Sequence, residues 1–155
     1  MTQEHPLVQL ARKALETYVR ERKTIEPPQE LTAEMQRRAG VFVSLHRQGD
    51  LRGCIGTIEA VHQNVALEII SNAVSAATRD PRFDPVEEDE LPLIQCSVDV
   101  LEEPETIVGT HQLDVQRYGV IVSRGSRRGQ ARLRQHRGSH RAGPQPAPRA
   151  HDEPR

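Results

Sequence analysis

Apolar residues recur at helical spacing in two segments of the chain. In residues 5–22 they lie three or four positions apart, and Lys and Arg gather toward the end of the segment. This pattern predicts an amphipathic helix. In residues 61–78 the apolar stripe is wider, with Val65, Ile69 and Ala73 at its centre. The second segment therefore predicts a helix that is largely buried.

Other segments alternate apolar and polar residues, as strands do. Residues 41–47 alternate in this way, QGD supplies a turn, and residues 51–59 resume the alternation, which together predict a β-hairpin. A strand is predicted around 94–101, with Cys96 on its apolar face as a core residue, and a last strand over 118–123. Helices and antiparallel hairpins without regular βαβ alternation indicate an α+β fold, an antiparallel sheet with packed helices.

The composition changes sharply after this last strand. Residues 126–155 contain one Leu and four Pro but no Ile, Val, Phe, Tyr or Met, so they bury too little apolar surface to offset the cost of ordering. Residues 1–125 are therefore predicted to form the domain, incomplete at its C-terminal end, and 126–155 a disordered Arg/Pro/His-rich tail. Residues 124–155 carry 9 Lys and Arg against 2 Asp and Glu, whereas 1–123 carry 12 against 20. Such a tail fits either a nucleic-acid arm or the product of a shifted reading frame.

Composition excludes several classes of protein. The chain has no apolar run of membrane-spanning length and no visible export signal, which predicts a cytoplasmic protein without a membrane partner. Two cysteines are too few for a disulfide framework, and aromatic residues make up only 3%, which argues against base stacking on nucleic acid. The seven histidines show no paired ligand spacing, and no GxGxxG, P-loop or iron–sulfur motif occurs, so neither metal nor cofactor is predicted.

The stretch LRGCIG sets Cys54 between Gly53 and Gly56 inside a predicted strand. Glycine in a strand marks a bulge or the close approach of another backbone or a ligand. Cys54 is therefore either a nucleophile, with main-chain N–H groups to receive an oxyanion, or a small wall residue of a binding turn. Arg52 favours a thiolate only if it points toward the sulfur. A base would come from His46 or His62 through tertiary contact.

A second candidate set follows the predicted buried helix. Arg52 and Arg82 can hold a carboxylate or phosphate bidentately, with Asp80 orienting one of them. The same residues can equally form a structural ion pair that closes this loop. Phe83 is read as a loop anchor packed on the core rather than as a stacking platform.

Several separated blocks resemble one known family. LRGCIGT, AATRDPRF, DELPLIQCSVDVL and YGVIVSRGSRRG occur in the order typical of the AMMECR family, also called AmmeMemoRadiSam system protein A. The resemblance runs from about His5 to Gly129 and implies an α+β domain with a cleft by LRGCIG. It also implies association with a Memo-like protein and a radical SAM protein, and it assigns no reaction. The arginine-rich end of the chain departs from the family pattern.

Three functional hypotheses follow from these residues. The first is a binding or accessory component of the Memo-like and radical SAM pathway, which holds a small anionic ligand or modified residue at Arg52–Gly56 and Asp80–Phe83. The second is an enzyme that uses Cys54 as nucleophile in acyl or alkyl transfer. The third, nucleic-acid association, rests on the basic tail alone.

Overall fold

Two long helices form one layer of the protein in its computed structural model. α1 (Pro6–Glu21) begins after His5, and α3 (Val65–Thr78) begins after Asn64; each cap side chain accepts a hydrogen bond from a main-chain N–H of the first turn. Both helices were predicted from their periodicity. The second starts later than expected, since residues 61–63 precede its cap, Asn64. The structure describes residues 4–103, 105–106, 108–109, 111, 118–125 and 128–141.

The sheet is built on the predicted hairpin. β1 (Val41–Arg47) and β2 (Asp50–Gly56) pair antiparallel, and their turn contains Gln48 and Gly49, both with positive φ. β3 (Ile94–Leu101) pairs antiparallel with the other side of β1. The order β2-β1-β3 leaves β2 at an edge of the sheet.

Short elements connect these parts. α2 (Ala33–Gln36) lies between α1 and β1, and the 3₁₀ helix η1 (Glu88–Leu93) leads directly into β3. β4 (Glu105–Thr106) follows β3. Within the described part of the chain, no helix combines the length and apolar character needed to cross a membrane.

The strand after the last predicted one was not expected. β5 (Tyr118–Gly125) pairs antiparallel with β6 (Arg128–Arg141), and β6 also pairs with β3 and β4. Residues 128–141, which the sequence places in a disordered tail, thus form a strand in the structure. Strands pair through main-chain N–H and C=O groups, so a segment poor in apolar residues can still join a sheet. Residues 126–127 and 142–155 of the predicted tail lie outside the described part.

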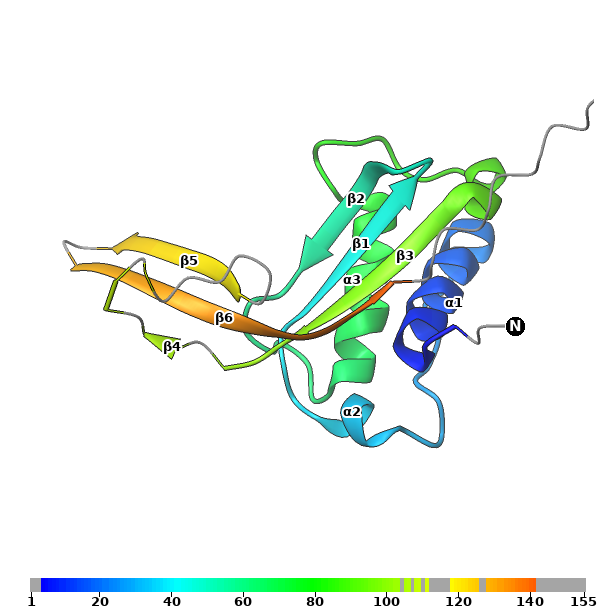
Figure 1. Ribbon diagram of the computed structural model, residues 1–155. Helices are drawn as coiled ribbons and strands as arrows, with labels where there is room; N and C mark the ends of the chain where they lie inside the picture. The colour runs from blue at the N-terminus through cyan, green and yellow to red at the C-terminus, as the bar shows by residue number, and fades with distance from the viewer. Residues whose placement is uncertain are drawn as a thin grey trace, which may run out of the picture.

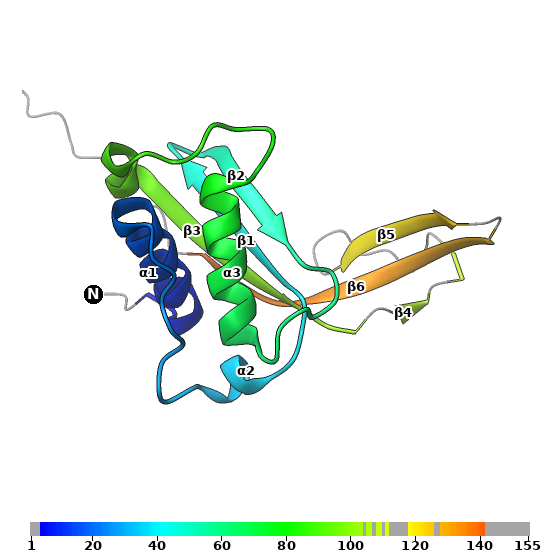
Figure 2. The same cartoon turned by 180° about the vertical axis from the view of Figure 1, so that it is seen from behind.

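The core lies between the helices and one face of the sheet. α1 and α3 pack against each other and against this face (Figure 2), whereas Figure 1 looks onto the opposite face, which none of the described helices crosses. Val41, Val43 and Leu45 of β1 are fully buried beneath the helices, and Val98 of β3 is buried with them. This arrangement of helices on an antiparallel sheet is the α+β fold that the sequence predicts. In Figure 1 the β5–β6 hairpin extends away from the helical layer.

Candidate functional site

The Cys54 thiol lies on the side of the sheet opposite α1 and α3. Gly53 pairs with Leu45, which is buried under the helices, and Cys54 pairs with Ser44. Because neighbouring residues of a strand point to opposite faces, the Cys54 thiol lies on the face away from the helices. The Cys54 Sγ and Ser44 Oγ atoms are 3.2 Å apart and share a hydrogen bond. The cysteine is half-buried, which leaves part of the residue open to solvent.

The two glycines beside Cys54 serve packing. A Cβ atom on Gly53 would overlap the carbonyl oxygen of Ala76 on α3, and one on Gly56 would overlap the ring of Phe42. Gly53 thus allows the helix backbone to approach the strand closely, and Gly56 makes room for an aromatic ring. The glycine pattern correctly signalled close approach, but the neighbours are a helix and a ring of the same chain.

The loop after α3 covers the outer edge of β2 at Cys54. The main-chain N–H of Cys54 donates to Asp80 Oδ2 at 2.9 Å, and its carbonyl accepts from Arg82 Nη2 at 3.4 Å. Arg82 also donates from Nε and Nη2 to the two oxygens of Asp80, at 3.0 and 2.8 Å. These hydrogen bonds hold the pKa of the buried Asp80 carboxyl well below its usual range, and those from the Arg82 side chain have the largest effect. The side chains of Asp80 and Arg82 therefore bond the main-chain N–H and C=O of Cys54, as a neighbouring strand would do.

Arg82 and Phe83 continue this surface outward. The side chain of Arg82 is 57% exposed, and its guanidinium carbon lies 5.4 Å from the centre of the Phe83 ring. The hydrogen bonds to Asp80 raise the pKa of Arg82, so it stays charged. The structure thus brings Cys54, Asp80, Arg82 and Phe83 together at one edge of the sheet.

Arg52 is not part of this group. The pairing of β1 with β2 shifts register between Leu45 and His46, where Arg52 is the extra residue of a bulge. Its guanidinium donates to both oxygens of Glu90, at 2.9 and 3.0 Å, and to the Asp84 carbonyl at 2.8 Å. Arg52 therefore anchors the loop that leads into η1, and it is not directed at the Cys54 thiol.

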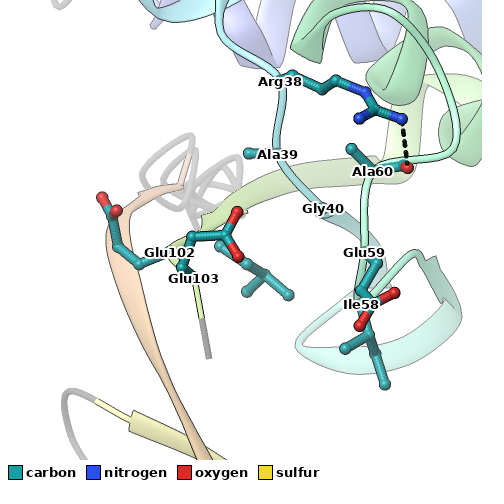
Figure 3. Close-up of a pocket in the computed structure, with 9 residues that line it drawn as sticks. Arg38, Ala39, Gly40, Ile58, Glu59, Ala60, Glu102 and Glu103 are labelled. Atoms are coloured by element: carbon teal, nitrogen blue, oxygen red, sulfur yellow. Dashed lines mark hydrogen bonds between the residues drawn. The ribbon is translucent and has the colours of Figure 1, made fainter. Parts of the chain in front are cut away.

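A cavity of about 470 Å³ opens at the far end of β2. Three separate segments line it, as Figure 3 shows: residues 38–40 before β1, residues 58–60 after β2, and residues 101–103 at the end of β3. Gly40 lies in the wall of the cavity. Only glycine fits there, because a Cβ atom would overlap the carbonyl oxygens of Thr57 and Ile58. No pattern in the sequence brought these segments together.

Comparison with known proteins identifies the domain. The family model described as AMMECR1 matches residues 8–131, which is most of the chain. The chain belongs to the AMMECR1 family. This match confirms the resemblance to the AMMECR family.

Individual relatives extend the AMMECR1 assignment. A protein from Thermotoga maritima is 51% identical over 83% of this chain and 75% of its own length. A Clostridium acetobutylicum protein is 51% identical over 80% of this chain but only 27% of its own length. A crystal structure of an uncharacterised protein from Pyrococcus horikoshii matches with a TM-score of 0.72 and 38% identity, over 77% of this chain and 64% of that one. The chain therefore spans less than two thirds of the last two relatives.

A buried polar network in the AMMECR1 domain escaped the sequence analysis. Glu68 of α3 is fully buried; its Oε1 accepts from the N–H groups of Val61 and His62, and its Oε2 accepts from Thr57 Oγ1 at 2.8 Å. Asn72, one turn later, donates to the Val41 carbonyl at 2.9 Å. The available signal was a single Glu within an otherwise apolar helix face. The network fixes residues 57–62, the loop that forms one wall of the cavity.

The candidate bases of the AMMECR1 domain lie apart from each other. His46 lies two residues after Ser44 on β1 and so shares the face of the Cys54 thiol. His62 lies in the loop after β2, where its main-chain N–H donates to Glu68 at 2.6 Å. Across the described residues, no group of three or more His, Cys, Asp or Glu is placed to hold a metal ion.

Proposed function

We propose that this AMMECR1 domain binds a small anionic ligand or a modified residue at the surface formed by Cys54, Asp80, Arg82 and Phe83. The observation that carries this proposal is the state of Arg82, whose guanidinium is oriented by Asp80 while its side chain remains 57% exposed. An arginine fixed in this way offers a directed donor to a carboxylate or phosphate without first losing its own rotamer freedom.

The remaining donor of Arg82 defines the ligand position. Nε and Nη2 are bonded to Asp80 and the Cys54 carbonyl, and Nη1 makes no hydrogen bond within the described residues. A ligand that accepts from Nη1 would lie beside the Phe83 ring. Arg52 contributes indirectly in this proposal, since its guanidinium is bonded to Glu90 and two main-chain carbonyls.

Thermal-shift measurements on the full chain, against a panel of small phosphates and carboxylates, test the anion site. We expect some of these compounds to raise the Tm of the parent protein, and Arg82→Gln to remove that increase. Arg79→Gln is the matched control, because Arg79 is an exposed arginine of the same loop. If every stabilising compound acts equally on the parent and on Arg82→Gln, the proposal fails.

We propose further that the domain acts in the cytoplasm as an accessory of a Memo-like protein and a radical SAM protein. The family membership supports this assignment through the association implied by the resemblance. Co-expression with a Memo-like protein, followed by size-exclusion chromatography, tests it. Separate elution of the two proteins, with and without the ligand found above, would contradict the association.

One observation favours a second candidate function, a cysteine-dependent enzyme. The Cys54 Sγ atom shares a hydrogen bond with Ser44 Oγ on the sheet face that no described helix crosses, and His46 lies on the same face. In acyl transfer the thiolate would attack a carbonyl carbon and expel the leaving group, with the base taking the thiol proton. Iodoacetamide kinetics across pH test this reading, because a nucleophilic cysteine should alkylate faster than a model thiol at neutral pH.

A further inference from the structure

The cavity at the far end of β2 has an excess of acidic side chains. Of its charged lining residues, Arg38 is basic, whereas Glu59, Glu102 and Glu103 are acidic. Arg37, which lies beside the cavity, is paired with Glu102 at 3.5 Å. Three glutamates against Arg37 and Arg38 leave a net charge of -1 at the cavity, and the carboxylates of Glu59 and Glu103 are the exposed ones.

The rim of the cavity already binds one cationic group of the chain itself. The guanidinium of Arg38 donates from Nε to the His62 carbonyl at 3.3 Å and from Nη2 to the Ala60 carbonyl at 3.4 Å. Figure 3 shows the second of these bonds beside the opening. The loop after β2 therefore presents main-chain oxygens to a cation, in addition to the glutamate side chains.

The wall that carries these oxygens is held from inside the protein. The fully buried carboxylate of Glu68 accepts hydrogen bonds from the main chain at Val61 and His62 and from the hydroxyl of Thr57. On the other side, Gly40 allows the two backbones to touch. A wall fixed in this manner loses little conformational freedom when a ligand binds, which favours affinity.

We propose that this cavity binds an aliphatic ammonium or guanidinium group. The carboxylates of Glu59 and Glu103 would pair with the charge, and Ile58, which is 44% exposed, would contact the methylene groups that precede it. A volume of about 470 Å³ is large enough for a lysine or arginine side chain from a partner, or for a free polyamine. This site is separate from the proposed anion site at Arg82 and selects the opposite charge.

Titration of the full chain with defined probes, followed by ¹H–¹⁵N NMR, tests the cavity. The probes are Nα-acetyl-lysine amide, the same compound with an acetylated side chain, and spermidine. We expect saturable shifts of the amide signals of residues 58–60 and 101–103 with the charged probes only. Tighter binding of the lysine compound would indicate a protein side chain as the ligand, and tighter binding of spermidine a free polyamine.

Variants connect this binding to the named residues. The double variant Glu59→Gln, Glu103→Gln should bind the charged probes about tenfold more weakly or worse. Glu30→Gln, which removes an exposed carboxylate far along the sequence, should bind as the parent does. The proposal is wrong if the charged probes cause no saturable shifts at millimolar concentration. It is also wrong if the acetylated compound binds equally well, or if the double variant binds like the parent while its spectrum shows that it is folded.

Discussion

The two cysteines occupy opposite sides of the sheet and should differ in reactivity. Cys96 is 2% exposed, and burial raises the pKa of its thiol to about 12. Cys54 is half-buried, on the face away from the helices. Because thiolates are the reactive form, iodoacetamide at pH 8 should label Cys54 in the folded protein and spare Cys96. Peptide mass spectrometry after timed labelling measures both rates.

Two controls make the labelling experiment decisive. The same reaction in denaturant should label both cysteines, which shows that protection of Cys96 depends on folding. Cys54→Ser should remove nearly all labelling of the folded protein. Labelling of Cys96 at a rate close to that of Cys54 without denaturant would show that the strand face of Cys96 is accessible.

Gly53 predicts a second effect at the scale of one residue. In Gly53→Ala the new methyl group would overlap the Ala76 carbonyl oxygen, so α3 or β2 must shift. Overpacking of this kind costs roughly 1 to 3 kcal/mol of unfolding free energy, measurable by urea denaturation. Gly49→Asn is the comparison and should cost less, because a new side chain there meets open space and asparagine tolerates a positive φ better than most residues. Equal midpoints for Gly53→Ala and the parent would contradict the close contact.

At the scale of elements, η1 depends on an ion pair that is sensitive to acid. Glu90 accepts hydrogen bonds from Arg52 and Arg47. These interactions lower the pKa of Glu90 to about 2, and the hydrogen bonds from Arg52 have the largest effect. In the unfolded chain the pKa of Glu90 should be near its ordinary value of 4.5. Between pH 2 and pH 4.5 the folded state therefore binds fewer protons than the unfolded state does. The stabilising effect of Glu90 is therefore complete above about pH 4.5 and is lost as the pH falls toward 2.

A charge-neutral variant isolates this effect. At pH 7, Glu90→Gln should lower the free energy of unfolding by roughly 2 kcal/mol, as expected for the loss of charged hydrogen bonds. The difference from the parent should shrink steadily when urea denaturation is repeated at lower pH. Asp89→Asn, in the same turn and exposed, should differ little from the parent at any pH. A difference for Glu90→Gln that stays constant across the acid range would exclude the ionised Glu90 as its source.

Local patterns predicted elements well where packing follows periodicity. The strand 94–101 and the hairpin around QGD were predicted because their buried faces alternate with the strand period. Glu68 was missed because two of its partners are main-chain N–H groups of the loop just before α3, which no side-chain pattern encodes. β6 was missed for a related reason, since apolar content does not report main-chain pairing. The bulge that turns Arg52 toward Glu90 likewise depends on pairing register.

At the scale of the whole molecule, β2 is an edge strand that must be protected from pairing with other chains. Asp80 and Arg82 occupy the outward N–H and C=O of Cys54. Removal of this cover in Asp80→Ala should expose the edge and increase self-association. We expect a larger apparent mass than that of the parent in light scattering, rising with protein concentration.

The matched variant for this test is Asp84→Ala, which removes an exposed carboxylate from the same loop. It should keep the mass of the parent, because only the main-chain carbonyl of Asp84 contacts Arg52. If Asp80→Ala and Asp84→Ala show the same mass at every concentration, the edge is protected by something other than the Asp80 side chain.

The central position of β3 has a consequence for synthesis on the ribosome. Ser44 of β1 pairs with Ser97 of β3, and α1, which precedes both strands in the chain, packs against the same late strand. The β1–β2 hairpin and α3 can form early, but α1 has no complete surface to dock on until residues near 101 have left the exit tunnel. Until then the part of the apolar stripe of α1 that β3 covers remains exposed. Nascent chains halted before β3 should therefore bind chaperones, and release of β3 should end that interaction.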